Sequence, residues 1–347
     1  MDQGLAGSCA ALERGTPAAV EVLARVDRFQ QRHLVLAAPI AVSKRFGEHD
    51  GGRLAATVSY YSFFSVFPLM LVFVTVLGIV LEGDDKLRED LIDGAVGQIP
   101  LIGSQLADDT IPGSGWVLLV GVATALWAGM AAVGALQHGL DVIADVPVHR
   151  RPNFLMKRVR SLVFLLLFGV GICLSTVMSN AATLFDVGWL TGAVGLAGTF
   201  AVNSLLLLMT FSVLPARRPP WRRLLPGALV GGALLVALQL LASFIVRRFL
   251  AGASDIGGAF ATVLALLSWF HLVSRVILMS AELNEVLVDR LWPRRLLGQL
   301  PPTDADRRAT LLDVQRVQRD AKLGYAVSVD GQVATDEEPL GSAPPSP

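Results

Sequence analysis

The sequence predicts an all-α membrane protein: a bundle of six transmembrane helices with both termini in the cytoplasm and peripheral helices near the N- and C-termini. Of the 347 residues, 53% are hydrophobic and only 17% are charged, whereas soluble domains carry about 25% charged residues. Six segments are long and apolar enough to cross a bilayer, which takes about 20 helical residues. The number of basic residues is alternately high and low in successive loops, and this pattern predicts one topology.

The six apolar segments are each predicted to be a helix, because a span in lipid must satisfy its own backbone hydrogen bonds. The runs are too long and too continuous for strands, and no alternating ten-residue pattern is present. In chain order, the predicted spans are 56–81, 116–137, 160–181, 189–214, 225–247 and 257–281.

The distribution of lysine and arginine predicts the orientation of the spans. From the N-terminal segment through the five loops to the tail, these residues number seven, two, five, none, four, two and eight. Cytoplasmic loops carry the excess of basic residues, so both termini are expected in the cytoplasm of a multi-pass cell-membrane protein. Residues 1–30 lack the basic and apolar regions of a signal peptide.

Three parts of the chain follow from this topology. Residues 1–52 form a cytoplasmic segment, residues 53–290 the six-helix domain and residues 291–347 a cytoplasmic tail. Within the first part, 17–46 has apolar positions at helical spacing between basic residues, which fits either an interfacial helix or an ordinary short cytoplasmic helix. The segment 303–322 predicts a short charged helix. From about 325 the tail is polar and proline-rich, and we expect it to be disordered.

The sixth span, in the stretch SWFHLVSRVILMSAELNEVL, carries an unusual polar face. Ser268, His271, Arg275 and Glu282 fall within about 60° on a helical wheel. Charged residues at membrane depth are costly and usually face a bundle interior or a watery cavity. We therefore expect these four residues to line a pathway for a polar cargo. The alternative is that Arg275 extends to the inner headgroups and that Glu282 is interfacial.

The first span adds three further pathway candidates. Tyr61, Ser65 and Pro68 lie at i, i+4 and i+7 on one predicted face. A proline inside a helix removes a backbone hydrogen bond and tends to kink the helix. The carbonyl released near Phe64 could meet a serine, a water molecule or a substrate group. A plain kinked packing helix with small polar residues at its contacts is the alternative.

The sequence predicts no catalytic residue, metal site or cofactor. His138, Asp141 and Asp145 follow one another along the second span, but further ligands for a metal are not evident, so we expect them to be solvated at the helix end. Cys9 and Cys173 have no metal or redox spacing. No nucleotide-binding motif is present.

Three blocks of the sequence resemble the YihY/BrkB family of bacterial inner-membrane proteins. The first is RLAATVSYYSFFSVFPLMLVFVTVLG (53–78), and the second is LWAGMAAVGALQHGLDVIADVPVHRRPNFLMKRVRSL (126–162). The third combines SVLPARRPPWRRLLPGALVGGALL (212–235) with GGAFATVLALLSWFHLVSRVILMSAELNEVL (257–287). The resemblance covers all six spans. The chain departs from the family pattern at Asp141, where asparagine is expected, and before Gly257, where tyrosine is usual.

The resemblance implies a six-helix protein of the cell envelope. Members of the family have been described as a tRNA-processing ribonuclease and as virulence or serum-resistance factors, and movement of a lipid or an envelope precursor is one role considered for them. A metal-dependent nuclease needs clustered carboxylates or histidines, and the cytoplasmic segments show none, so we expect no enzyme and no nucleic-acid partner.

Two functional hypotheses remain from the sequence. In the first, the protein transports or flips a lipid or envelope precursor along the polar interior face, with membrane lipids as its partners. In the second, it is a non-catalytic membrane scaffold that binds proteins of the envelope machinery through its peripheral segments. The polar face of the sixth span favours the first hypothesis.

Overall fold

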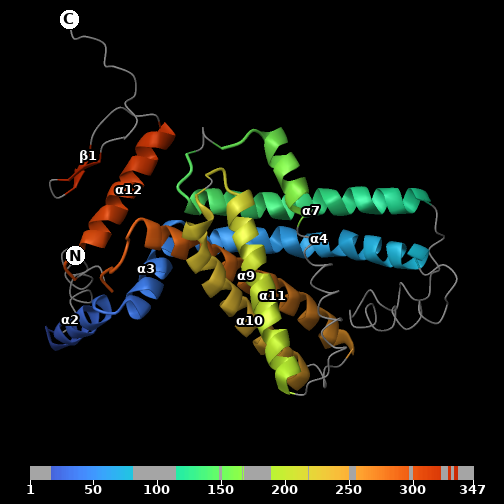
Figure 1. Cartoon of the computed structure of the whole chain (residues 1–347), viewed down its shortest axis with the longest axis horizontal. Coiled ribbons are helices and arrows are strands. Elements are labelled where there is room, and N and C mark those ends of the chain that lie inside the picture. The colour runs from blue at the N-terminus through green and yellow to red at the C-terminus, as the bar shows by residue number, and fades with distance from the viewer. Residues whose placement is uncertain are drawn as a thin grey trace, which may run out of the picture. The chain divides into compact units, whose positions relative to one another are not determined.

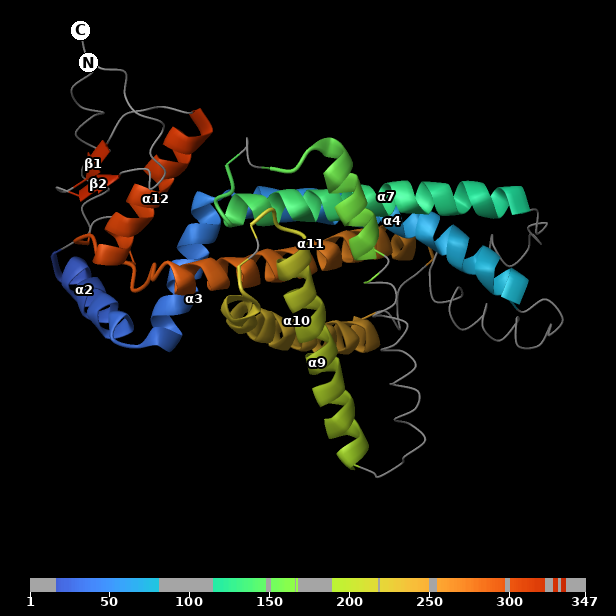
Figure 2. The same ribbon diagram turned by 45° about the horizontal axis from the view of Figure 1, so that its top comes forward.

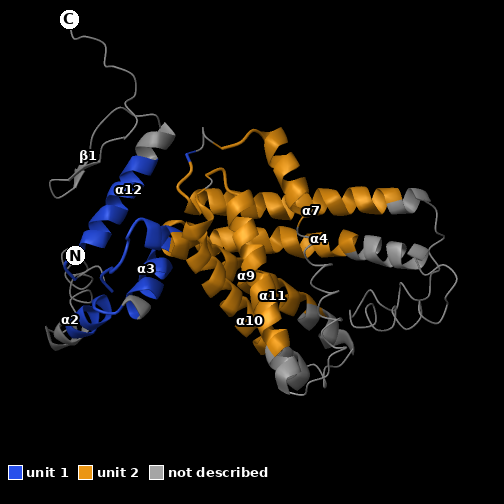
Figure 3. Ribbon diagram, viewed as in Figure 1, with its two compact units in different colours: residues 1–45, 147–149, 285–347 blue, residues 46–146, 150–284 orange. Residues whose placement is uncertain are grey.

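The structure of the protein is a computed structural model that describes residues 17–80, 115–147, 151–165, 167, 189–217, 219–249, 255–296, 300–321, 327–329 and 332–334. The chain divides into two compact units, which Figure 3 colours separately. Unit 1 contains residues 1–45, 147–149 and 285–347, and unit 2 contains residues 46–146 and 150–284.

Unit 2 is built from long apolar helices (Figure 1). These are α4 (Gly51–Val80), α7 (Gly115–Ile143), α9 (Trp189–Val213), α10 (Trp221–Phe249) and α11 (Asp255–Val288), whose last residues belong to unit 1. Residues 154–165 are also helical. Five of the predicted spans therefore coincide with described helices, and most of the third, 160–181, lies outside the described residues. In both views α4 runs alongside α7 (Figure 1 and Figure 2), and α9 packs against α10.

Within the residues that the structure describes, four helices have the length and composition to cross a membrane. The qualifying segments are Leu119–Ile143, Val194–Val213, Trp221–Ala242 and Val263–Val288. Their surfaces are largely apolar and exposed, as lipid-facing surfaces must be, with Trp127, Leu205 and Phe260 as examples. The helices thus make an all-α membrane protein, as the composition predicts.

The hydrophobic core of unit 2 lies at one end of these helices. Its buried members come from the first turns of α4 and α10, from the last turns of α7, α9 and α11, and from Phe46 of α3 and Phe164 of the helical residues 154–165. Leu140, Leu214, Ala228 and Leu278 are examples that are almost completely buried. The starts of α4 and α10 meet the ends of α7, α9 and α11 here, so α4 and α10 run in the opposite direction to the other three helices.

Glycines let α10 approach its neighbours closely. A Cβ atom on Gly227 would lie 2.1 Å from the carbonyl oxygen of Ser280, and one on Gly231 would lie 2.4 Å from the hydroxyl oxygen of Ser280. On the other side, a Cβ atom on Gly232 would lie 2.2 Å from the hydroxyl oxygen of Ser204. The small residues of the GALVGGALL stretch therefore set the distance of α10 from α11 and α9, as helix contacts in membranes often do.

Unit 1 contains α2 (Pro17–Gln31), α12 (Asp304–Ala321) and most of α3 (Leu34–Glu48). The single helix considered for 17–46 is thus two helices, because the chain turns at Arg32 and His33, where their amides bond to the carbonyls of Phe29 and Gln30. In the tail, β1 (Val327–Val329) and β2 (Gln332–Ala334) pair antiparallel. The expectation of disorder from about 325 is wrong for these six residues.

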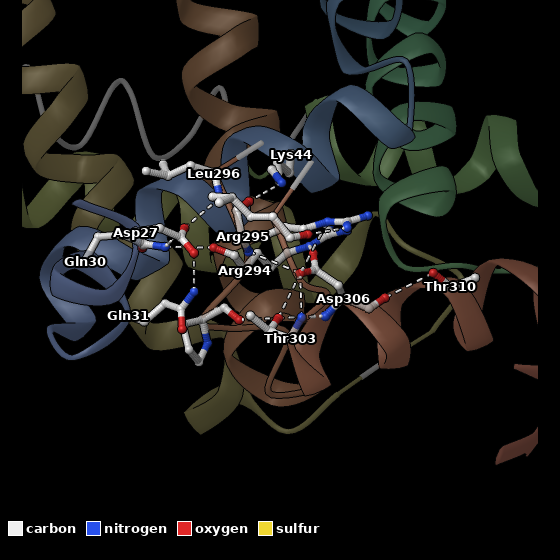
Figure 4. A network of polar contacts seen from close by, with 12 residues as sticks. Asp27, Gln30, Gln31, Lys44, Arg294, Arg295, Leu296, Thr303, Asp306 and Thr310 are labelled. Carbon is white, nitrogen blue, oxygen red and sulfur yellow. Dashed lines mark hydrogen bonds and ion pairs between the residues drawn. The ribbon is translucent and has the colours of Figure 1, made fainter. Parts of the chain in front are cut away.

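A polar network holds unit 1 together (Figure 4). At the start of α12, Thr303 and Asp306 form a reciprocal cap: the Asp306 amide donates to Thr303 Oγ1, and the Thr303 amide donates to Asp306 Oδ2. The Arg294 guanidinium donates to Asp306 Oδ1 at 3.0 Å. Burial would raise the pKa of Asp306, but these donors and the Arg295 amide outweigh burial and lower the pKa.

Candidate functional site

A fully buried pair of a histidine and a glutamate lies within the core end of unit 2. His49 follows the last turn of α3, and Glu282 lies in the last two turns of α11. The distance from His49 Nδ1 to Glu282 Oε1 is 2.5 Å, and neither side chain is exposed to solvent. On the other side of the imidazole, Asp145 Oδ1 lies 3.4 Å from His49 Nε2. The histidine ring is therefore flanked by two carboxylates.

The backbone brings Asp145 to the histidine through an uncommon conformation. Asp145 follows α7 with a φ of 49°, in the left-handed region that glycine usually occupies at a helix end. The amide of the next residue, Val146, donates to the Asp141 carbonyl and closes the helix. Asp50, which directly follows His49, has a φ of 52°. Such conformations cost free energy and persist where the surrounding structure holds them.

Two more polar side chains are buried on α7, Asp141 about one turn and Gln137 about two turns before Asp145. Asp141 is fully buried, and its Oδ1 accepts a hydrogen bond from the Ala216 amide at 2.8 Å. Gln137 is 1% exposed. Within the described part of the chain, neither Nε2 nor Oε1 of Gln137 has a hydrogen-bond partner, and Asp141 Oδ2 has none either. Gln137 and Asp141 are four positions apart in the sequence. They therefore lie on the same face of α7, about 6 Å from each other along the helix axis.

Asn284 adds a polar contact between α11 and α10. Its Oδ1 accepts a hydrogen bond from the Gly227 amide at 2.7 Å, while its buried Nδ2 has no partner among the described residues. Gly227 directly follows Pro226 inside α10. In the described residues, the core end of unit 2 therefore contains the His49–Glu282 pair and several amide and carboxylate groups with unused hydrogen-bonding capacity. We call His49, Gln137, Asp141, Asp145, Glu282 and Asn284 the buried polar cluster.

The structure divides the residues predicted on the sixth span. Glu282 is fully buried in the cluster, whereas Arg275 and Ser268 are exposed and His271 is partly exposed. The Arg275 guanidinium lies over the ring of Phe46, 5.7 Å from its centroid. The wheel alignment of the four residues is therefore not a single buried face, and of the four only Glu282 joins the buried polar cluster.

The candidates on the first span lie apart from the cluster contacts. Tyr61 is exposed, and its ring lies edge-on to that of Tyr60. Ser65 is buried, and its hydroxyl donates to the Ser62 carbonyl at 2.7 Å, within its own helix. Pro68 is partly buried, and α4 continues through it to Val80. These observations place the three residues and leave their role a prediction.

Sequence reasoning did not select His49, Gln137 or Asn284 as candidates. His49 lies in the polar stretch GEHDGG before the first span, where a histidine resembles an ordinary loop residue. The sequence did contain one indication of this cluster: a histidine and acidic residues occur at several predicted helix ends that lie on the same predicted side of the membrane. Of the residues considered on α7, His138 is exposed beside Arg151, whereas Asp141 is buried. In the described residues, no group of three or more His, Cys, Asp or Glu is arranged to hold a metal ion.

Long apolar helices and a buried polar cluster at their common end define a multi-pass α-helical membrane protein. The family described as Virulence factor BrkB matches residues 42–299. The chain belongs to this family, as the three sequence blocks indicate.

Several relatives cover most of the chain. It is 26% identical over 288 residues to the inner membrane protein YhjD of Escherichia coli (strain K12), covering 76% of this chain and 84% of the relative. It is 27% identical over 265 residues to YfkH of Bacillus subtilis (strain 168), a protein named only provisionally as ribonuclease-like, covering 71% and 93%. A UPF0761 membrane protein of Azotobacter vinelandii is 27% identical over 267 residues, covering 74% and 65%. No solved structure matches the chain.

Proposed function

We propose that this protein is a six-span cell-membrane protein, with both termini in the cytoplasm, that moves a lipid or envelope precursor between the leaflets. The observation that carries the proposal is Gln137, a side chain buried to 1% exposure whose donor and acceptor are both without a partner in the described residues. The topology rests on the alternation of basic residues along the chain.

The free-energy cost of Gln137 supports a functional role for it. Each buried polar group without a hydrogen bond costs about 1–3 kcal/mol, and a leucine of similar volume would avoid that cost. Such a group is useful when another state of the protein, or a bound molecule, supplies the missing partner. A polar headgroup entering the cluster could accept from Gln137 Nε2 and Asn284 Nδ2 and donate to Asp141 Oδ2, all of which are available.

This chemistry favours a cargo with both donors and acceptors in its headgroup, such as hydroxyls beside a phosphate or sugar. The close glycine contacts of α10 with α11 and α9 provide smooth surfaces along which the helices can shift when the cargo enters. The His49–Glu282 pair would hold the core end of the helices together during such a shift. In this proposal, Arg275, His271, Ser268, Tyr61, Ser65 and Pro68 guide the cargo along the outer parts of the helices.

The test is complementation of a deletion strain, with lipidomics that separates the inner and outer leaflets. The Gln137→Leu variant should insert and accumulate like the wild-type protein, yet fail to restore the leaflet distribution of the affected lipid. Asn203→Leu is the matched control, because Asn203 is a polar span residue paired with Gln239 at 3.3 Å, away from the cluster. Full restoration by Gln137→Leu would refute the role proposed for this residue.

A scaffold role is the second candidate, and a hollow in unit 1 favours it. This hollow, of about 550 Å³, is lined by residues of α2, the segment 292–305 and α12, with Trp292 and Pro302 among them. Trp292→Ala tests it: the scaffold hypothesis expects loss of function with an unchanged lipid distribution between leaflets. Purified protein that cleaves tRNA, with loss of cleavage in Asp141→Asn or His138→Ala, would instead support a ribonuclease.

A further inference from the structure

The two faces of α2 differ in what contacts them. One face is occupied within unit 1 (Figure 4). Asp27 Oδ1 accepts a hydrogen bond from the Leu296 amide at 2.8 Å, and Gln30 Nε2 donates to the Arg294 carbonyl at 2.8 Å. Asp27 and Gln30 are both buried. This face therefore fixes the helix against the segment that precedes α12.

The opposite face of α2 combines large apolar and basic side chains. Phe29 is 59% exposed and Val26 is 50% exposed. Arg25 and Arg28 on the helix and Arg32, directly after its last residue, are also exposed, and Arg28 in addition lines the edge of the unit 1 hollow. At 100° per residue the four of these side chains that lie on the helix span an arc of about 160°. Among the described side chains of α2, the acidic Asp27 lies on the other face, so those described in this arc are apolar or positively charged.

We propose that this face of α2 docks on the anionic surface of the membrane leaflet at which α4 begins, independently of any transported cargo. Arginines beside an aromatic and an aliphatic side chain match a bilayer surface, which offers lipid phosphates outside and acyl chains a few ångströms deeper. Covalent connection keeps the helix within reach of that surface. Only α3, about 22 Å long at 1.5 Å per residue, and two short turns separate α2 from α4.

The charge and the apolar side chains make separate contributions. Phe29 and Val26 would insert among the upper acyl chains, while Arg28 and Arg32 would contact phosphates. Each arginine near an anionic leaflet strengthens docking about five-fold, and the effect weakens with salt. Replacing both arginines should therefore reduce the docking equilibrium by about 25-fold. Removing Phe29 should weaken docking in a manner that salt does not change.

The experiment uses the full chain in lipid nanodiscs, with Cys9→Ser and Cys173→Ser removing the native thiols. A fluorescent probe is attached at position 33 in a His33→Cys variant, because His33 is exposed and its ring lies 4.9 Å from that of Phe29. Quenching by lipids with a nitroxide in the upper acyl chain is compared between phosphatidylcholine discs and discs that also contain phosphatidylglycerol. A probe at position 304 in Asp304→Cys, where the side chain is 83% exposed, provides the reference.

We expect strong quenching at position 33 in the anionic discs, weaker quenching in the neutral discs and little at position 304. Arg28→Gln with Arg32→Gln should reduce the quenching, as should Phe29→Ser. Arg308→Gln, which removes an exposed charge of unit 1 from α12, should leave it unchanged. An unquenched probe in both kinds of disc would overturn the proposal and leave the face to a protein partner. Equal quenching in both kinds would overturn the role of anionic lipid.

Discussion

Buried carboxylates in the two units differ in how completely their oxygens are hydrogen-bonded. In unit 1, both oxygens of Asp27 and both oxygens of Asp306 accept hydrogen bonds from backbone amides or side chains. In unit 2, Asp141 is more deeply buried, yet only its Oδ1 accepts a hydrogen bond, and the neighbouring Gln137 makes none in the described residues. The first arrangement is typical of a structural network, and the second retains capacity for a partner.

This difference separates residues that hold the fold from residues available for function. Fully satisfied buried networks rigidify a protein, whereas partly satisfied ones cost free energy. Substitutions in the unit 1 network should therefore lower stability and affect function only through it. Substitutions at Gln137 and Asp141 should change function with little loss of stability. The His49–Glu282 pair is an intermediate case, because both side chains are fully buried but lie 2.5 Å from each other.

Breaking the His49–Glu282 pair should have the largest effect. His49→Leu leaves the Glu282 carboxylate buried without its imidazole, and removing one partner of a buried pair costs about 3–5 kcal/mol. The double variant His49→Leu with Glu282→Leu removes both groups and should recover most of that loss. Thermal unfolding of the detergent-solubilised protein measures both. If the double variant is as unstable as His49→Leu, the loss of stability does not come from leaving Glu282 without its partner.

The next largest effect is expected at Gly227. The Cβ atom of Gly227→Ala would meet the carbonyl oxygen of Ser280 at 2.1 Å, and because this is backbone, α10 and α11 must separate. Overpacking of this kind costs about 3 kcal/mol. Gly198→Ala is the control, since no atom lies within 4 Å of a Cβ placed there, and alanine favours a helix over glycine. A comparable melting temperature for the two variants would contradict the close contact.

The apolar helices could be predicted from the sequence, because length and hydrophobicity are local properties. The predicted span 189–214 and helix α9, for example, differ by one residue at the end. Helix ends with polar residues were less predictable: α7 extends to Ile143 rather than 137, because Gln137 and Asp141 are buried instead of solvated. Hydropathy alone assigns such residues to water.

The candidate site was only partly predictable, for a geometric reason. Glu282 could be selected because it interrupts an apolar helix, but its partner His49 is 233 positions away. A helical wheel orders residues around one helix and gives no information on which neighbours cover each side. Arg275 and Glu282 therefore appeared equivalent on the wheel, although one is exposed and the other is fully buried.

A matched pair of Asp→Asn substitutions compares the two units directly. Asp306→Asn weakens the hydrogen bonds from charged and backbone donors. It should therefore lower the free energy of unfolding by about 2 kcal/mol at neutral pH. Asp141→Asn retains an oxygen for the Ala216 amide and replaces the carboxyl oxygen Oδ2, which has no hydrogen-bond partner among the described residues, so it should leave stability unchanged or raise it. The loss of stability in each variant is measured by chemical unfolding that is monitored in each unit by hydrogen exchange. The Asp304→Asn variant, at an exposed side chain, is the control. Equal losses for Asp141 and Asp306 would remove the distinction between the networks.

The contribution of Asp306 should also depend on pH. Burial opposes ionisation, but the surrounding donors lower the pKa of Asp306 below its ordinary value. A carboxylate with a lowered folded pKa stabilises the fold above its unfolded pKa, about 3.9, and loses that contribution as pH falls through the folded value. Hydrogen exchange in residues 291–306 should therefore increase relative to Asp306→Asn as the solution becomes acidic. A constant ratio between the two proteins across this range would contradict the assignment.

The smallest effect on stability is expected at Arg275, which tests whether exposed charge on α11 belongs to the function. Its guanidinium contacts the Phe46 ring from an exposed position, and such a cation–π contact contributes about 0.5–1 kcal/mol. Arg275→Ala should thus change the melting temperature only slightly. If this variant still restores the leaflet distribution while Gln137→Leu does not, the cargo contacts the buried cluster rather than the guanidinium. If Arg275→Ala loses transport and Gln137→Leu keeps it, the polar pathway lies instead on the exposed side of α11. The variant would then be stable but inactive because it lacks one accessible charge.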